Sequence, residues 1–83
     1  MFSIKHLTKC FQLLKSYGMG TLYLSTSNNL CYIIYRINSE DCFGIDEHND
    51  NGVVYTYFET SKKVLDMIHK WAPTINSVRY VCE

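Results

Sequence analysis

The chain has 83 residues, a formal net charge of zero at neutral pH, 47% hydrophobic residues and 19% charged residues. This length predicts a single domain over residues 1–83, and the apolar fraction excludes the composition typical of disordered chains. The balanced charge disfavours direct binding to nucleic acid, which usually requires a basic excess.

Residues 1–18 predict a helix rather than a targeting segment. Ser3 can cap the helix, and Gly18 can end it in the left-handed conformation. Its apolar stripe has helical spacing and comprises Ile4, Leu7, Phe11 and Leu14. Lysines interrupt the apolar core that a signal peptide needs, and no run approaches the ~20 apolar residues of a membrane span. We therefore expect a cytoplasmic protein without membrane attachment.

Four strands are expected between this helix and residue 60, separated by polar turns. They are TLYLST (21–26), LCYIIYRI (30–37), DCFGID (41–46) and VVYTYFE (53–59). Turn-forming residues between them predict antiparallel pairing of consecutive strands. The stretch DEHNDNG (46–52) is expected to be the last of these turns, and a turn centred near Asn49 would place Ile45 opposite Val54.

A second helix is expected over KKVLDMIHKWA (62–72), capped by Thr60 or Ser61. Its buried stripe comprises Val64, Leu65, Ile68 and Trp71. Pro73 ends it, and INSVRYVC (75–82) alternates as a fifth strand. The order α-β-β-β-β-α-β predicts an α+β fold, with a four- to five-stranded antiparallel sheet and two helices packed on one face.

The polar stretch DEHNDNG also invites comparison with a calcium-binding EF-hand loop. With Gly52 at the invariant glycine position, Glu47, Asn49 and Asn51 fall on oxygen-ligand positions. Phe58 then occupies the position of the bidentate glutamate, and the flanks read as strands, so a hairpin turn fits better. The four cysteines lack the paired spacing of zinc sites. We expect no metal and no cofactor.

Catalytic motifs are also not evident in the sequence. Cys10 and His6 lie four residues apart on the first helix, where they could share a face as nucleophile and base. No glycine-rich strand-to-helix turn accompanies them. The expectation is therefore that the protein is not an enzyme.

Acidic residues are concentrated in the turns and strand ends, where six of the eight lie between positions 40 and 59. Such a surface could dock on a basic partner, and neighbouring tyrosines could supply buried anchors. We therefore expect a non-enzymatic protein-binding module, an inhibitor or regulator whose partner is another protein. The expected contact residues are Glu40, Asp41, Asp46, Glu47, Asp50, Tyr55 and Tyr57.

Two alternatives remain open at this point. Tyrosines on an uncovered sheet face could stack the bases of single-stranded nucleic acid, although few basic residues lie on the expected strands. The tyrosines concerned are Tyr23, Tyr32, Tyr35, Tyr55 and Tyr57. A homodimer formed through strand 30–37 or the C-terminal strand is also compatible with the sequence, because an exposed sheet edge invites pairing.

In size and composition the chain resembles the small accessory proteins of phages and mobile elements, a group that includes anti-CRISPR proteins. The similarity lies in a compact domain rich in Ile, Asn, Tyr and Lys, acidic in part and without a catalytic motif, and it covers no defined stretch. The resemblance implies an inhibitor that presents acidic surface to a nucleic-acid-binding complex.

Overall fold

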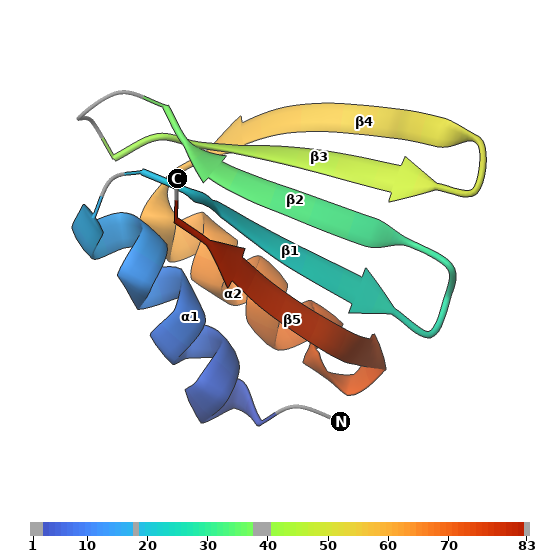
Figure 1. Ribbon diagram of the computed structural model, residues 1–83, viewed down its shortest axis with the longest axis horizontal. Helices are drawn as coiled ribbons and strands as arrows, with labels where there is room; N and C mark the ends of the chain where they lie inside the picture. The colour runs from blue at the N-terminus through green and yellow to red at the C-terminus, as the bar shows by residue number, and fades with distance from the viewer. Residues whose placement is uncertain (1–2, 18, 38–40, 83) are drawn as a thin grey trace.

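Two helices and five strands follow one another in the predicted order (Figure 1). The computed structural model describes residues 3–17, 19–37 and 41–82, with the backbone alone at residue 54. The capping role expected of Gly18 lies outside these ranges. The elements are α1 (Ile4–Tyr17), β1 (Thr21–Thr26), β2 (Cys31–Arg36), β3 (Phe43–Asn49), β4 (Gly52–Glu59), α2 (Ser61–Trp71), the short 3-10 helix η1 (Ala72–Thr74) and β5 (Ile75–Val81).

The strands form one antiparallel sheet in the order β4-β3-β2-β1-β5. The first four strands form a meander, and α2 returns the chain so that β5 pairs with the far side of β1. The edges of the described sheet are therefore β4 and β5. The expectation that strand 30–37 could pair with a second copy is wrong, because β2 is bonded on both sides by β1 and β3.

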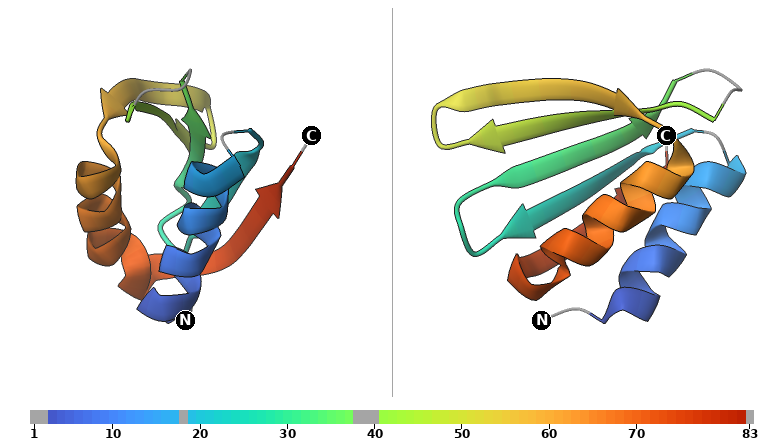
Figure 2. Two further views of the ribbon diagram at one scale, coloured as in Figure 1. Left: turned by 90° about the vertical axis from the view of Figure 1, so that its left-hand side faces the viewer. Right: turned by 180° about the vertical axis from the view of Figure 1, so that it is seen from behind.

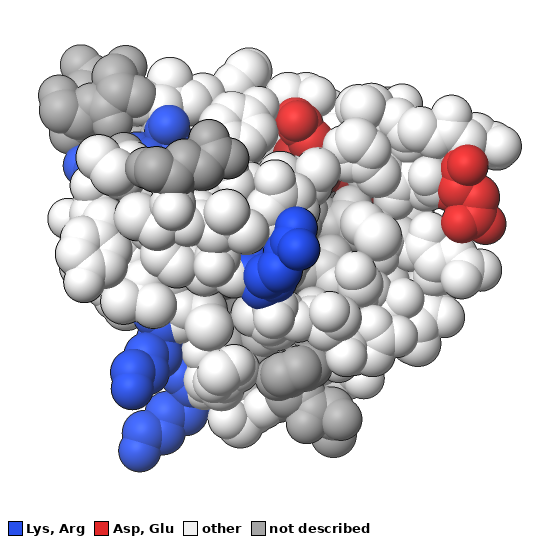
Figure 3. Space-filling view, in the orientation of Figure 1, with Lys and Arg blue, Asp and Glu red and all other residues white. Residues whose placement is uncertain are grey.

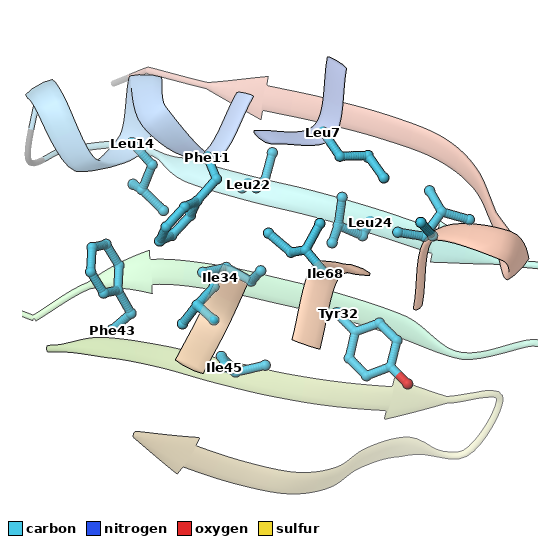
Figure 4. Packing of buried hydrophobic residues seen from close by; sticks show 13 residues of the cluster. Leu7, Phe11, Leu14, Leu22, Leu24, Tyr32, Ile34, Phe43, Ile45 and Ile68 are labelled. Carbon is cyan, nitrogen blue, oxygen red and sulfur yellow. The ribbon is translucent and has the colours of Figure 1, made fainter. Parts of the chain in front are cut away.

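Both helices pack on the same face of the sheet, as predicted, and the other face carries no helix (Figure 2). The core lies between these layers, where α1 contacts β1, β2 and β5 and lies beside α2. Inward-facing side chains from both layers meet in Figure 4. The core comprises Leu7, Phe11, Leu14, Leu22, Leu24, Tyr32, Ile34, Phe43, Ile45, Val64, Ile68, Ala72 and Ile75. Both predicted helical stripes are thus confirmed as core-facing, although Ile4, Leu65 and Trp71 are only partly buried.

The start of α2 is defined by side-chain hydrogen bonds. Thr60 is the N-cap, and its hydroxyl oxygen accepts a bond of 3.4 Å from the backbone N–H of Lys63. This bond satisfies one of the donors that the first turn of a helix leaves unpaired. At the other end Ala72 begins η1, which contains Pro73, so the helical path tightens just before β5.

The stretch DEHNDNG is mostly strand, which corrects the expected turn. β3 continues to Asn49 and β4 begins at Gly52, so the connection is short. Asn49 Oδ1 accepts a bond of 2.8 Å from the backbone N–H of Asn51, and Gly52 has a φ of 117°, which favours glycine. Ile45 faces Tyr57, three residues beyond the predicted partner. The tip of β3 extends past the helices (Figure 1), and Asn49 at this end of the strand is exposed.

Candidate functional site

Asp41 binds the start of α2 rather than projecting freely from a turn. The backbone N–H of Ser61 donates a hydrogen bond of 3.0 Å to Asp41 Oδ1. Hydrogen bonds from the hydroxyl and the backbone N–H of Ser61 hold the pKa of Asp41 below its usual value. A carboxylate at this position also interacts favourably with the positive end of the helix dipole. Asp41 therefore links the segment that precedes β3 to α2.

Asp46 and Glu47 are neighbours in β3 and consequently point to opposite faces of the sheet. Asp46 lies on the uncovered face, where Asp46 Oδ1 accepts bonds from the hydroxyls of Tyr35, at 3.2 Å, and Thr56, at 2.9 Å. Glu47 lies on the face that carries the helices, in line with Tyr32 and Tyr55 across the strands. The two carboxylates therefore belong to different surfaces.

The structure describes one of the two remaining acidic residues of the predicted contact set. Asp50 is exposed in the turn between β3 and β4, and Glu40 lies outside the described residues. Together with the positions of Asp41, Asp46 and Glu47, this arrangement separates the described acidic residues of the predicted set. Within the described part of the chain, Asp46 and Glu47 do not share one acidic surface, and the role of each predicted residue in partner binding stays a prediction.

Three residues of the predicted set do come together, around Glu47. Tyr57 donates its hydroxyl to Glu47 Oε1 at 3.0 Å, and Tyr55 lies directly opposite Glu47 on β4. On the other side Tyr32 stacks on Trp71, with ring centroids 3.7 Å apart and an interplanar angle of 12°. We call these five residues, Tyr32, Glu47, Tyr55, Tyr57 and Trp71, the Glu47 cluster.

Two tyrosines of the Glu47 cluster, Tyr57 and Tyr32, are held in the protonated form. Burial raises the pKa of Tyr57, and the hydrogen bond to Glu47 and the charge of Glu47 raise it further. Burial, the charge of Glu47 and a hydrogen bond to it raise the pKa of Tyr32 in the same direction. Both phenols therefore remain donors, which fixes the Glu47 carboxylate in place by charge-assisted hydrogen bonds. A carboxylate flanked by aromatic rings is suited to a cationic group.

A groove with a volume of about 410 Å³ lies between β4 and α2, beside this cluster. Its lining combines two apolar side chains with four charged ones and comprises Tyr57, Glu59, Lys63, Asp66, Met67 and Lys70. The four helical members lie three or four positions apart and therefore share one face of α2. Tyr57 belongs both to this β4–α2 groove and to the Glu47 cluster, so the two features are continuous.

β4 itself is an exposed apolar edge. Val53 and Tyr55 are each 60% exposed and Phe58 is 58% exposed. Among the described residues, no strand pairs with the outer side of β4. Edge strands are commonly protected by lysine, proline or short length. β4 has eight residues and carries one charge, at Glu59, so its outer backbone can accept another strand.

The Cys10–His6 pair has the geometry of a weak contact rather than of an activated nucleophile. Cys10 Sγ lies 3.8 Å from His6 Nε2 on an exposed side of α1. Burial raises the pKa of the Cys10 thiol, although the charge of Lys9 opposes this. A raised pKa keeps sulfur in the thiol form, whereas the thiolate is the nucleophile. Among residues 3–17, 19–37 and 41–82, no group of three metal-ligating side chains is assembled.

The sequence alone did not single out the helical side of the groove. Lys63, Met67 and Lys70 flank the buried stripe of α2 and recur with helical spacing, which is the signal by which they could have been found.

Within the described ranges, neither helix has the length and apolarity needed to cross a membrane. Comparison of the chain with protein-family models, curated proteins and solved structures finds no match.

Proposed function

We propose that this protein is a non-enzymatic binding module that adds an extended segment of a partner protein to the outer edge of β4. The observation that carries this proposal is the groove of about 410 Å³ directly beside an unprotected edge strand. In strand addition, backbone hydrogen bonds supply affinity and pockets for alternate side chains supply specificity. The edge of β4 and the β4–α2 groove provide these two components.

The spacing of the site defines the partner segment. Side chains of an added strand point to the helix-bearing side at every second residue, about 6.6 Å apart. In an antiparallel strand, the residue opposite Tyr57 enters the β4–α2 groove over Met67, and the residue two positions later lies opposite Tyr55. Tyr57 and Met67 supply apolar surface to the groove lining, so the first of these residues should be apolar.

The residue of the added strand that lies opposite Tyr55 should be Lys or Arg. Glu47 lies one strand beyond Tyr55, so an added residue opposite Tyr55 is about 9.6 Å from Glu47 between backbones. Only a long side chain spans this distance, and a cationic one would contact the exposed ring of Tyr55 before reaching the carboxylate. The partner segment is therefore apolar-x-basic. A module that occupies such a segment blocks its other contacts, which is how an inhibitor or regulator acts.

Selection of random-sequence displayed peptides against the protein tests this proposal. Selected peptides should show the apolar-x-basic pattern, and Glu47→Gln should weaken their binding about tenfold, because a charged hydrogen bond is lost. Asp50→Asn is the matched control, since it neutralises a carboxylate in the adjacent turn, and binding should remain unchanged. Fluorescence anisotropy measures both affinities.

Backbone methylation of the selected peptides tests the mode of binding. Methylation of every second backbone nitrogen should abolish binding in one frame and spare it in the other, because an added strand directs alternate N–H groups toward β4. Equal effects in both frames, or equal affinities of Glu47→Gln and Asp50→Asn, would contradict the proposal.

A further inference from the structure

The sheet face opposite the helices is covered by no described element (Figure 2). Figure 1 views this face, and Figure 3 shows that few charged side chains lie over the strands. The strand registers arrange its side chains in rows that cross the sheet. One row comprises Val81, Thr21, Tyr35, Gly44 and Phe58, and the next comprises Arg79, Tyr23, Ile33, Asp46 and Thr56.

Two opposite charges lie within the second of these rows. The described strands direct two residues with charged side chains to this face, Arg79 on β5 and Asp46 on β3. Three strand spacings of about 4.8 Å separate them, or about 14 Å in all, which is too far for an ion pair within one chain. Each charge is therefore available to a second molecule.

The positions of these charges are related by a simple symmetry. A two-fold axis parallel to the strands, passing above the boundary between β1 and β2, exchanges β1 with β2 and β5 with β3. Two copies packed face to face about this axis keep their rows aligned. Arg79 of each copy then faces Asp46 of the other, and Tyr23 faces Ile33 of the other. The face is thus complementary to itself, as an isologous interface requires.

We propose that this face binds a second copy of the chain, with two Arg79–Asp46 pairs closing the interface. The axis leaves β4 outside the overlap, and the β4–α2 groove is on the other side of the sheet. Self-association and segment binding are therefore independent, so the failure of one leaves the other standing.

Contacts within the chain orient both charged side chains. The hydroxyls of Tyr35 and Thr56 donate to Asp46 Oδ1, which orients the carboxylate so that its other oxygen can accept from a guanidinium. The guanidinium carbon of Arg79 lies 5.1 Å from the centroid of the Tyr23 ring. Such contacts reduce the side-chain entropy that an ion pair across an interface would otherwise cost.

The expected dimer is weak and depends on concentration. Four overlapping strands of about six residues cover roughly 20 by 20 Å, or about 400 Å² of flat contact for each copy. Stable complexes bury about 800 Å² per partner. We therefore expect a dissociation constant in the micromolar range, measurable by sedimentation equilibrium between about 10 μM and 1 mM protein at low salt.

A charge-swap series tests the interface. Arg79→Asp alone places like charges opposite each other at both pairs, as does Asp46→Arg alone, and each variant should dimerise about 100-fold more weakly than the wild type. An equimolar mixture of the two variants restores opposite charges at both pairs and should form a heterodimer with nearly wild-type affinity. Circular dichroism verifies that each variant is folded. If Asp46→Arg does not fold, Arg79→Lys replaces the mixture, because it keeps the charge and should retain the dimer.

Three results would overturn the proposal. A wild-type protein that is monomeric at 1 mM and low salt has no such interface. Unchanged dimerisation of Arg79→Asp would mean that the copies associate through another surface, such as the edge of β4. Binding of a single-stranded oligonucleotide to the wild-type monomer, lost in Arg79→Asp, would assign the face to nucleic acid instead.

Discussion

Gly44 lies beneath the ring of Tyr35 on the uncovered face, and its replacement by alanine measures how tightly that face is packed. A Cβ atom at Gly44 would clash with Cε2 and Cζ of the Tyr35 ring and come 2.7 Å from its hydroxyl oxygen. The ring must therefore swing away from the sheet. In doing so it loses the hydrogen bond to Asp46 and part of its packing against β3.

The size of the effect follows from these losses. A hydrogen bond to a charged acceptor contributes about 1.5 kcal/mol, and the partial exposure of the ring costs about 1 kcal/mol. The substitution also stabilises the strand by about 0.5 to 1 kcal/mol, because glycine is unfavourable within a strand. We expect Gly44→Ala to lower the free energy of unfolding by about 1.5 to 2 kcal/mol, equivalent to a Tm roughly 10 °C lower.

Urea denaturation followed by the fluorescence of Trp71, the one tryptophan of the chain, measures this change. A protein concentration well below the dissociation constant of the expected dimer keeps self-association from contributing. The decisive comparison is a double-mutant cycle with Tyr35→Ala. Without the ring, Gly44→Ala should be neutral or stabilising. If Gly44→Ala is equally destabilising with and without Tyr35, the clash is not its cause and the described packing is wrong.

Two further predictions concern the start of α2. Thr60→Ala removes the N-cap and should lower the free energy of unfolding by about 0.5 to 1 kcal/mol in the same urea titration, the low end of the usual range because the bond is long; an unchanged midpoint would contradict the capping role. Asp41→Asn should lower the Tm at pH 7, with a difference that disappears on acidification. The pKa of Asp41 is lowered in the folded state, so its contribution is present above the unfolded-state pKa of about 3.9 and is lost as pH falls through the folded-state pKa. A Tm difference that persists at pH 2 would argue against this linkage.

The helices were predictable because their periodicity is strong and local. Val64 and Ile68 recur with helical spacing after a capping Thr60, and the structure buries both side chains and confirms the cap. The α+β fold with helices on one face was predictable for a related reason. Apolar residues at alternate positions, such as Leu22 and Leu24, identify one buried sheet face that needs a cover.

The register of the last hairpin was not predictable from the same signals. Composition places Asp46, Glu47 and His48 in a turn, yet they continue β3 and pair with Thr56, Tyr55 and Val53 of β4. A strand whose two faces are both polar at one end has a weakly specified register. The structure also contains a bulge between Glu47 and His48. Neither a local propensity nor the spacing of apolar residues indicates such a bulge.

The same strand geometry determines how much of the candidate site was accessible to sequence reasoning. The tyrosines and Glu47 were singled out by residue type, but only the pairing of β3 with β4 brings Tyr55 and Tyr57 to the same side as Glu47. Lys63 and Met67 join them through the position of α2 over β4. α2 follows β4 directly in the chain, but the periodicity of α2 indicates only which side of the helix is buried and not which strand that side faces.

The consecutive positions of Asp46 and Glu47 provide a way to separate the two proposed surfaces experimentally. Each is a carboxylate that accepts a hydrogen bond from a tyrosine hydroxyl on a neighbouring strand, so their chemistry is nearly the same. They differ in the face to which the strand directs them. Glu47→Gln should therefore weaken peptide binding and leave sedimentation unchanged, whereas Asp46→Arg should do the reverse. A general loss of stability would affect both measurements in both variants, so only the two-faced arrangement of β3 accounts for the crossed pattern.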